Sequence, residues 1–226
     1  MKILKTALIV LGLGLLAFLI VFLTKDFVVR HDFITKVQLV DYEDYILTMS
    51  CNNKKVATYY YTSDFVAERT YDENGELEKS ITIQDYIKNT NYKYNLETNE
   101  TFTTTNNSNT TRPANINNDI LLNFLKNQNK YNTQKFKYKG TESLNNRECY
   151  VLEFESKENG TITTIYLDKE LYYTARIDTY MPFIENNAEG TMDKHIIKDY
   201  TLDLNLKEKD LFKITIGGIL WKNRTN

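Results

Sequence analysis

Proline and glycine are scarce in this chain, with two prolines and eight glycines among 226 residues. Aromatic residues are abundant instead, and 17 of them are tyrosines. Aromatic and β-branched side chains fit a pleated, half-buried surface, so this composition favours a sheet-rich fold. Hydrophobic residues at 42% and charged residues at 26% describe a folded domain rather than a disordered chain.

A strongly basic block is also missing, because 28 Lys and Arg residues are offset by 30 Asp and Glu residues. The electrostatic footprint that nucleic-acid binding requires is therefore absent, and we predict no nucleic-acid partner. The acidic cluster of Asp41, Glu43 and Asp44 could supply paired carboxylates, but a solvated face is the simpler interpretation.

Catalytic and metal-binding motifs do not occur in the sequence. His31 and His195 are the two histidines, and neither lies near a Ser or Cys motif that suggests a catalytic triad. The H-E-x-x-H, C-x-x-C and G-x-S-x-G motifs are absent. We therefore predict no catalytic residue, no metal site, no cofactor and no enzymatic activity, with an enzyme of unrecognised type as the remaining alternative.

The two cysteines, Cys51 and Cys149, lie far apart, each within an apparent strand. Outside the cytoplasm an even number of cysteines permits a disulfide between them. Free cysteine is also among the most buried residue types, so two buried thiols are the other interpretation. A catalytic thiol is a third alternative.

The amino-terminal segment 1–24 carries the clearest signal in the chain. An uncharged run extends from Thr6 to Thr24, and a helix of that length spans about 28 Å, close to the roughly 30 Å hydrocarbon core of a bilayer. Lys2 and Lys5 precede the run and should hold the amino end in the cytoplasm. We therefore predict a single-pass anchor in the cell membrane, with the rest of the chain extracytoplasmic.

A cleaved signal peptide is the main alternative for this segment, and a buried soluble helix is a second. The apolar core of a signal peptide usually has about 7–15 residues and ends in a small-residue cleavage site. Here the run ends in Phe22-Leu23-Thr24-Lys25, which lacks that pattern, and no Cys follows that could take a lipid. An uncleaved anchor is the favoured interpretation.

The remaining part of the chain, about 200 residues, is long enough for a domain with a real core. We expect a juxtamembrane segment of mixed character at 25–44, an antiparallel β domain at 45–215 and a C-terminal tail at 216–226. Strand-like alternation begins at Tyr45, which shares one face with Leu47.

The clearest hairpin signal is Asn74-Gly75 between two alternating segments. We predict that 77–83 pairs antiparallel with 65–71 across this turn. Leu77, Ile81 and Ile83 should lie on the apolar face of the sheet, with polar residues between them on the wet face.

One soluble helix is predicted at 116–126, where Ile116, Ile120, Leu121, Phe124 and Leu125 recur on one helical face. The polar tract 101–111 before it reads as a mobile loop or ragged edge strand. A second run of strands follows the helix and ends in a long strand at 195–204, before a turn of helix at 206–212. The predicted fold is mostly β, with eight to ten antiparallel strands and a helix inserted between two halves.

This order of elements resembles the LolA-like lipoprotein carriers, in which a G-x-E-x-(apolar)-(turn)-R-x-C-Y-x-(apolar) segment opens the second run of strands. Here that segment is Gly140-Thr141-Glu142-Ser143-Leu144-Asn145-Asn146-Arg147-Glu148-Cys149-Tyr150-Val151-Leu152-Glu153. The strand Ile165-Tyr166-Leu167-Asp168 and the closing Leu211-Phe212 suit the pattern as well. The resemblance covers most of 40–215.

The resemblance implies an incomplete antiparallel β-barrel wrapped around a helix, with an apolar cavity for lipid or acyl chains. Some relatives in spore-forming bacteria, the GerS-type germination proteins, instead act by binding a cell-wall hydrolase. This chain differs from the soluble carriers in its predicted anchor.

These observations predict a membrane-anchored, extracytoplasmic, non-enzymatic binding module that holds a lipid or another hydrophobic ligand between the sheet and the helix. The expected ligand-binding residues are Leu47, Ile81, Tyr94, Phe124, Leu152 and Ile165. An ordinary filled core uses the same residue types and is the competing interpretation of these positions. The alternative function is a protein-binding scaffold of the cell envelope that uses a sheet edge or an aromatic surface.

Overall fold

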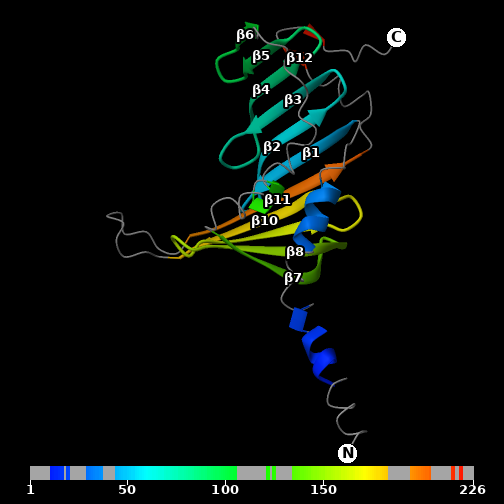
Figure 1. The fold of residues 1–226 in the computed structure, drawn as a ribbon. Helices are drawn as coiled ribbons and strands as arrows, with labels where there is room; N and C mark the ends of the chain where they lie inside the picture. Colours follow the sequence, from blue (N-terminus) through cyan, green and yellow to red (C-terminus); the bar gives the residue numbers. More distant parts are fainter. Residues whose placement is uncertain are drawn as a thin grey trace, which may run out of the picture.

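The computed structural model describes residues 11–17, 19–20, 29–37, 44–105, 121–122, 124–125, 134–182, 194–204, 215–216 and 219–220. Its main feature is one antiparallel sheet of eleven strands in the order β6-β5-β4-β3-β2-β1-β11-β10-β9-β8-β7 (Figure 1). The strands are β1 Tyr45–Cys51, β2 Lys54–Tyr61, β3 Phe65–Tyr71, β4 Glu78–Asp85, β5 Thr90–Asn95, β6 Glu100–Thr105, β7 Gln134–Leu144, β8 Arg147–Ser156, β9 Ile162–Asp168, β10 Thr174–Met181 and β11 Lys194–Asp203.

The sheet consists of two meanders, β1 to β6 and β7 to β11, joined where the last strand pairs with the first. In that junction Leu47 of β1 lies opposite Leu202 of β11. Among the described strands, β6 and β7 form the two ends of the sheet and do not pair with each other, so the sheet is open. The predicted mostly-β antiparallel architecture is confirmed, and the observed sheet has more strands than predicted.

The hairpin at Asn74-Gly75 is confirmed, because β3 pairs antiparallel with β4 across it. Gly75 adopts a φ of 79°, a conformation that L side chains rarely adopt. The carboxylate of Asp72 accepts hydrogen bonds from the amides of Glu76 (2.9 Å) and Leu77 (3.2 Å). Hydrogen bonds from the turn amides, that of Glu76 foremost, lower the pKa of Asp72, and they outweigh the opposing effect of burial.

The prediction that Leu77 lies on the apolar face is wrong, because its side chain is 69% exposed. Its amide is held by the Asp72 carboxylate within the turn, and β4 begins one residue later at Glu78. The alternation of β4 therefore starts after Leu77. Ile81 and Ile83 are buried as predicted.

A helix at 29–37 was not predicted, since we read 25–44 as a segment of mixed character. Val29, Phe33 and Val37 recur every four residues, which places them on one helical face. Phe33 and Val37 are buried in the main core, and Val29 packs against it. The intervening charged residues, such as Asp32 and its partner Lys36 at 2.8 Å, hide this short apolar stripe in the sequence.

The predicted helix at 116–126 is confirmed at the positions that the structure describes. Residues 121–122 and 124–125 are helical, and Leu121 and Leu125 are fully buried. Ile116 and Ile120 lie outside the described residues, as does the predicted turn of helix at 206–212. The polar tract begins with the edge strand β6, which confirms its strand interpretation for 101–105.

The predicted anchor falls mostly outside the described residues, which here comprise 11–17 and 19–20, all helical. Among the described residues, none belongs to a helix of sufficient length and hydropathy to span a bilayer. The anchor thus stays a prediction. Short strands β12 (Thr215–Ile216) and β13 (Ile219–Leu220) form a separate two-stranded sheet at the start of the predicted tail.

Candidate ligand-binding face

One face of the sheet is continuously apolar from β7 to β10. Tyr138 lies opposite Leu152, Leu152 opposite Ile165, and Ile165 opposite Ile177. Residues directly opposite each other in an antiparallel pair project to the same side of the sheet. These four side chains therefore form one row across four strands.

At the junction between the two meanders this row reaches the exposed Lys198 of β11, and the apolar face continues in a neighbouring row. Ile177 lies opposite Lys198, which shares its face with Leu202 because the two are an even number of residues apart. Leu202 is opposite Leu47, and Leu47 is opposite Tyr59 of β2. We call this side of the sheet the helix face, since the helix 29–37 packs on its side chains.

Both the helix 29–37 and the helical residues 121–122 and 124–125 pack on the helix face through aromatic contacts. The Phe33 ring lies 4.9 Å from that of Tyr150 and 6.0 Å from that of Tyr138, measured between centroids. From the second segment, the Phe124 ring lies 5.0 Å from that of Phe154. Such pairs contribute about 0.5–1.5 kcal/mol each beyond the area they bury.

A stacked tyrosine pair lies on the helix face where β1 meets β2. The rings of Tyr45 and Tyr61 are 4.3 Å apart between centroids. Burial, followed by the neighbouring tyrosines, raises the pKa of Tyr61 far above its usual range, so its hydroxyl stays protonated. This buried hydroxyl has no hydrogen-bond partner among the described residues, which leaves one donor unsatisfied within the apolar face.

The structure brings four of the six predicted ligand-binding residues together. Leu47, Leu152 and Ile165 are buried in the main core on the helix face, and Phe124 packs against that core. Ile81 and Tyr94 belong instead to a second cluster that includes Phe65, Ala67 and Ile83. The six predicted residues therefore do not line one space.

The register shows that the second cluster lies on the opposite side of the sheet. Following Leu47 outward, Tyr59 is opposite Glu68, Glu68 opposite Thr82, and Thr82 opposite Lys93. Ile81 and Tyr94 each stand one residue away from this row. Because successive side chains of a strand point to opposite faces, both project away from the helix face.

Both faces of β3 are buried, which allows the apolar side of the sheet to change there. Val66 packs in the main core, whereas Phe65 and Ala67 belong to the second cluster. Sequence alternation identified Ile81 and Tyr94 as apolar positions on one face. It carries no information on whether that face matches the apolar face of a distant strand.

Sequence reasoning also missed Phe33, Val37 and Tyr61 as residues of the helix face. The interval of four residues between Val29, Phe33 and Val37 was the available signal for the helix. Tyr61 offered no comparable signal, because its position depends on the pairing of β2 with β1.

The two cysteines are free thiols, so the disulfide alternative does not hold in this structure. Cys51 ends β1 and Cys149 lies in β8, with β11, β10 and β9 between these strands. Four strand spacings of about 4.8 Å separate them by roughly 19 Å, whereas bridged Cα atoms lie within about 7 Å. Burial raises the pKa of the Cys149 thiol to about 11, which disfavours a nucleophilic thiolate.

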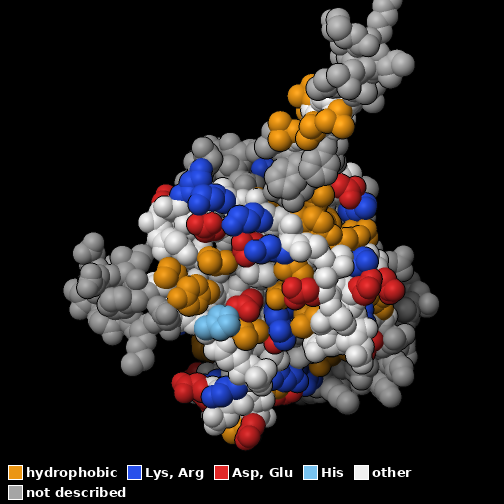
Figure 2. All heavy atoms as spheres, turned by 90° about the horizontal axis from the view of Figure 1, so that it is seen from below, with side chains coloured by type: hydrophobic (Ala, Val, Ile, Leu, Met, Phe, Trp, Pro, Cys, Tyr) orange, Lys and Arg blue, Asp and Glu red, His pale blue; other side chains and the backbone are white. Residues whose placement is uncertain are grey.

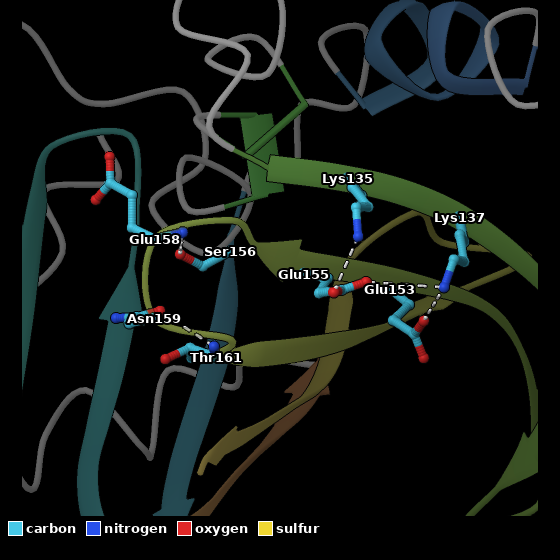
Figure 3. A network of polar contacts seen from close by, with 8 residues as sticks. All are labelled: Lys135, Lys137, Glu153, Glu155, Ser156, Glu158, Asn159 and Thr161. Carbon is cyan, nitrogen blue, oxygen red and sulfur yellow. Dashed lines mark hydrogen bonds and ion pairs between the residues drawn. The ribbon is translucent and has the colours of Figure 1, made fainter. Parts of the chain in front are cut away.

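The opposite side of β7 and β8 is ionic rather than apolar. Lys135 lies 3.2 Å from Glu155, and Lys137 lies 3.6 Å from Glu153 and 3.9 Å from Glu155 (Figure 3). Arg176 and Asp199 form a further pair at 2.6 Å across β10 and β11. In the view from below, side chains of both charge signs are interspersed (Figure 2).

A polar groove of about 760 Å³ lies between the β7–β8 and β9–β10 turns. Arg147 lies 3.2 Å from Asp168, and Lys169 lies 2.7 Å from Glu148. The hydrogen bond from Lys169 lowers the pKa of Glu148, which keeps that carboxylate charged. The paired charges suit contacts with polar groups. Among the described residues, no group of three or more His, Cys, Asp and Glu side chains could hold a metal ion.

Comparison with known proteins gives matches at the level of structure. No family model and no curated protein matches the sequence. A putative outer membrane lipoprotein-sorting protein domain from Vibrio parahaemolyticus has 13% identity and a TM-score of 0.25, over 79% of this chain and 94% of that one. A LolA superfamily protein from Nitrosomonas europaea has 11% identity and a TM-score of 0.25, over 81% and 96%.

The Pseudomonas aeruginosa MucA/MucB complex is a further match, with 9% identity and a TM-score of 0.42 over 80% of this chain. The match spans 58% of the chain in that complex. At these identities the similarity concerns the fold alone. With identities of 13% or less and TM-scores below 0.5, these matches are distant structural likenesses to a lipoprotein-sorting protein domain, a LolA superfamily protein and the MucA/MucB complex.

Proposed function

We propose that this protein is a membrane-anchored, extracytoplasmic and non-enzymatic binding module. Its ligand is a lipid or an acyl chain held between the helix face of the sheet and the two helical segments. The ligand-contacting residues are Leu47, Phe124, Leu152 and Ile165. Ile81 and Tyr94 belong to the second cluster and take no part in binding.

The observation that carries this proposal is the apolar face covered by helical segments, which the exposed Lys198 interrupts in one row and which Tyr200 and Leu202 continue across β11. The face runs from β7 through β11 and β1 to β2, about 29 Å at a strand spacing of about 4.8 Å. The helix 29–37 is about 14 Å long. A face of this width, which exceeds the length of the helix 29–37, can admit an acyl chain between sheet and helix without unpairing any strand.

The Tyr61 hydroxyl supports a ligand with a polar head group. It is a protonated donor within an apolar surface and has no hydrogen-bond partner among the described residues. Such a group gains most from a ligand carboxylate or ester oxygen, because a buried unsatisfied donor otherwise lowers stability.

The test uses a photoreactive fatty acid and the purified full-length chain, with labelled peptides mapped by mass spectrometry. We expect labels on peptides of β8, β9 and residues 121–125. Phe124→Ala should change the labelling yield severalfold, because it enlarges the space beside Phe154. Ile83→Ala is the matched control: it should lower the melting temperature and leave the yield unchanged, because Ile83 belongs to the second cluster.

Tyr61→Phe separates the polar contact from packing. This change removes only the hydroxyl, so thermal stability should stay equal or rise slightly. Labelling by the photoreactive acid should fall, while labelling by its aliphatic hydrocarbon analogue should not. If no label reaches the helix face in any variant, and Phe124→Ala simply loses stability, the face is a filled core and the proposal is wrong.

A protein-binding scaffold of the cell envelope is the second candidate, in the manner of the GerS-type partners of a wall hydrolase. The polar groove between the β7–β8 and β9–β10 turns favours it, since its paired charges suit a protein surface better than an acyl chain. A photo-cross-linking residue at Glu148 should then capture an envelope protein in intact membranes. Glu76, in the β3–β4 turn, is the control position.

A further inference from the structure

The two end strands of the sheet differ in their protection against pairing with another strand. β7 carries Lys135, Lys137 and Lys139, whose side chains are 54%, 51% and 47% exposed. The register between β7 and β8 also shifts between Tyr138 and Gly140. Lysines and bulges are devices by which natural sheets block edge-to-edge association. The β7 end is therefore protected.

The β6 end carries no lysine and no register shift, and its one charge is Glu100 at the first position of the strand. Residues 101–105 contain no charge and no proline, and their register with β5 is continuous. All residues of β6 are exposed, including Phe102 with 56% of its surface accessible. Within the described part of the chain, β6 pairs on one side only, and it lies at the opposite end of the sheet from β7 (Figure 1).

We propose that β6 is a homodimerisation edge that pairs antiparallel with β6 of a second copy. Pairing centred on Thr103 places Phe102 opposite Thr104 of the partner subunit and Thr101 opposite Thr105 of the partner subunit. Cross-strand aromatic–β-branched and Thr–Thr pairs are favourable in antiparallel sheets. No like charges meet within this segment, so the strand is self-complementary.

If β7 is paired antiparallel with β7 of a second copy in the same way, the result shows why a second copy fits the β6 edge and not the β7 edge. Antiparallel pairing centred on Lys137 places that lysine against its own copy, and Lys135 against Lys139 of the partner subunit. Like charges directly opposite each other destabilise a strand pair. Charge therefore confines self-association to the β6 edge and closes it at a dimer, because the interface is isologous.

The contact is small. Five residues at about 3.4 Å each form a contact line roughly 17 Å long, and one such line buries much less than the roughly 800 Å² per partner of a standard interface. We therefore expect a weak dimer whose population rises with protein concentration. The proposal does not depend on ligand binding, and either can fail without the other.

The first experiment is disulfide scanning of the full-length chain in a Cys51→Ser background. Cysteines are placed singly at 101, 102, 103, 104 and 105, and cross-linked dimer is measured under mild oxidation. We expect one position, Thr103→Cys, to exceed its neighbours about tenfold, because only the central residue faces its own copy. Lys137→Cys in the protected edge is the matched control and should stay near background.

The second experiment is sedimentation velocity over a range of concentrations. Thr103→Lys should abolish the concentration-dependent dimer, and Lys139→Thr should leave it unchanged, with circular dichroism showing that both variants fold. Equal cross-linking at all five positions, or no more than at Lys137→Cys, overturns the proposal. Cross-linking of Thr103→Cys solely to a different protein in whole membranes also overturns it, because the edge then serves another partner.

Discussion

At the scale of single residues, burial controls the chemistry of the two thiols. Cys149 is fully buried in β8, and desolvation, more than the nearby Asp168 carboxylate, raises the pKa of its thiol to about 11. Cys51 lies at the end of β1 and is partly exposed. The same residue type therefore serves as a core side chain at one position and as an accessible thiol at the other.

This difference predicts unequal reactivity of the thiols. At pH 8 a thiol of pKa about 11 is about one part in a thousand thiolate, and Cys149 is in addition inaccessible. A chromogenic disulfide reagent should label one thiol per native chain rapidly and two after denaturation. In Cys51→Ser the rapid phase should disappear. Rapid labelling that survives this change contradicts the burial of Cys149.

At the scale of elements, the β3–β4 hairpin shows how a local turn and a distant strand act together. The Asp72 carboxylate binds two turn amides, and the Gly75 amide donates to the Asp72 carbonyl at 3.0 Å. The turn also approaches the backbone of β2, since a Cβ added at Gly75 would lie 2.6 Å from the Lys55 amide nitrogen. Glycine is required here by conformation and by space.

Gly75→Ala should accordingly destabilise the protein more than Gly140→Ala. Both glycines have a positive φ, 79° and 105°, so both substitutions introduce backbone strain. A Cβ at Gly140 meets nothing within 4 Å, whereas one at Gly75 collides with a backbone that cannot easily move. We expect an additional loss of about 1–3 kcal/mol for Gly75→Ala, measured by urea denaturation. Equal losses would mean that the turn does not press against β2.

At the scale of the whole molecule, a single sheet serves two apolar clusters on opposite faces. The main core lies on the helix face, and the second cluster lies on the other face of β3 to β5. Strand β3 belongs to both, with Val66 in one cluster and Phe65 and Ala67 in the other. Because both clusters include side chains of β3, loss of this strand removes packing from both.

We expect the β sheet to unfold in one cooperative transition because of this shared strand. Leu152→Ala in the main core and Ile83→Ala in the second cluster should each cost about 2–5 kcal/mol. Both should shift the same transition, followed by far-ultraviolet circular dichroism and by tyrosine absorbance. Two separable transitions, each moved by one variant only, would show that the halves fold independently.

Much of the local structure could be predicted because its causes are local. Alternation of apolar and polar residues indicated the buried positions of β4, and the Asn74-Gly75 dipeptide placed its hairpin. The i, i+4 spacing around Leu121 and Leu125 predicted a helix, which the described residues confirm. Errors such as Leu77 arose at an element boundary, where one turn hydrogen bond decides which residue begins the strand.

Local sequence patterns were enough to predict the fold class and the β3–β4 hairpin. They also identified an apolar face on a strand such as β4, without indicating on which side of the sheet that face lies. The tertiary structure alone decided which faces belong together, because that depends on the non-local pairing of Leu47 with Leu202 and on the succession of registers from β2 to β5. A shift of one residue in any register reverses a face, and no local pattern encodes the sum of those registers. For that physical reason Ile81 and Tyr94 were predicted beside Leu47 and lie on the other side of the sheet.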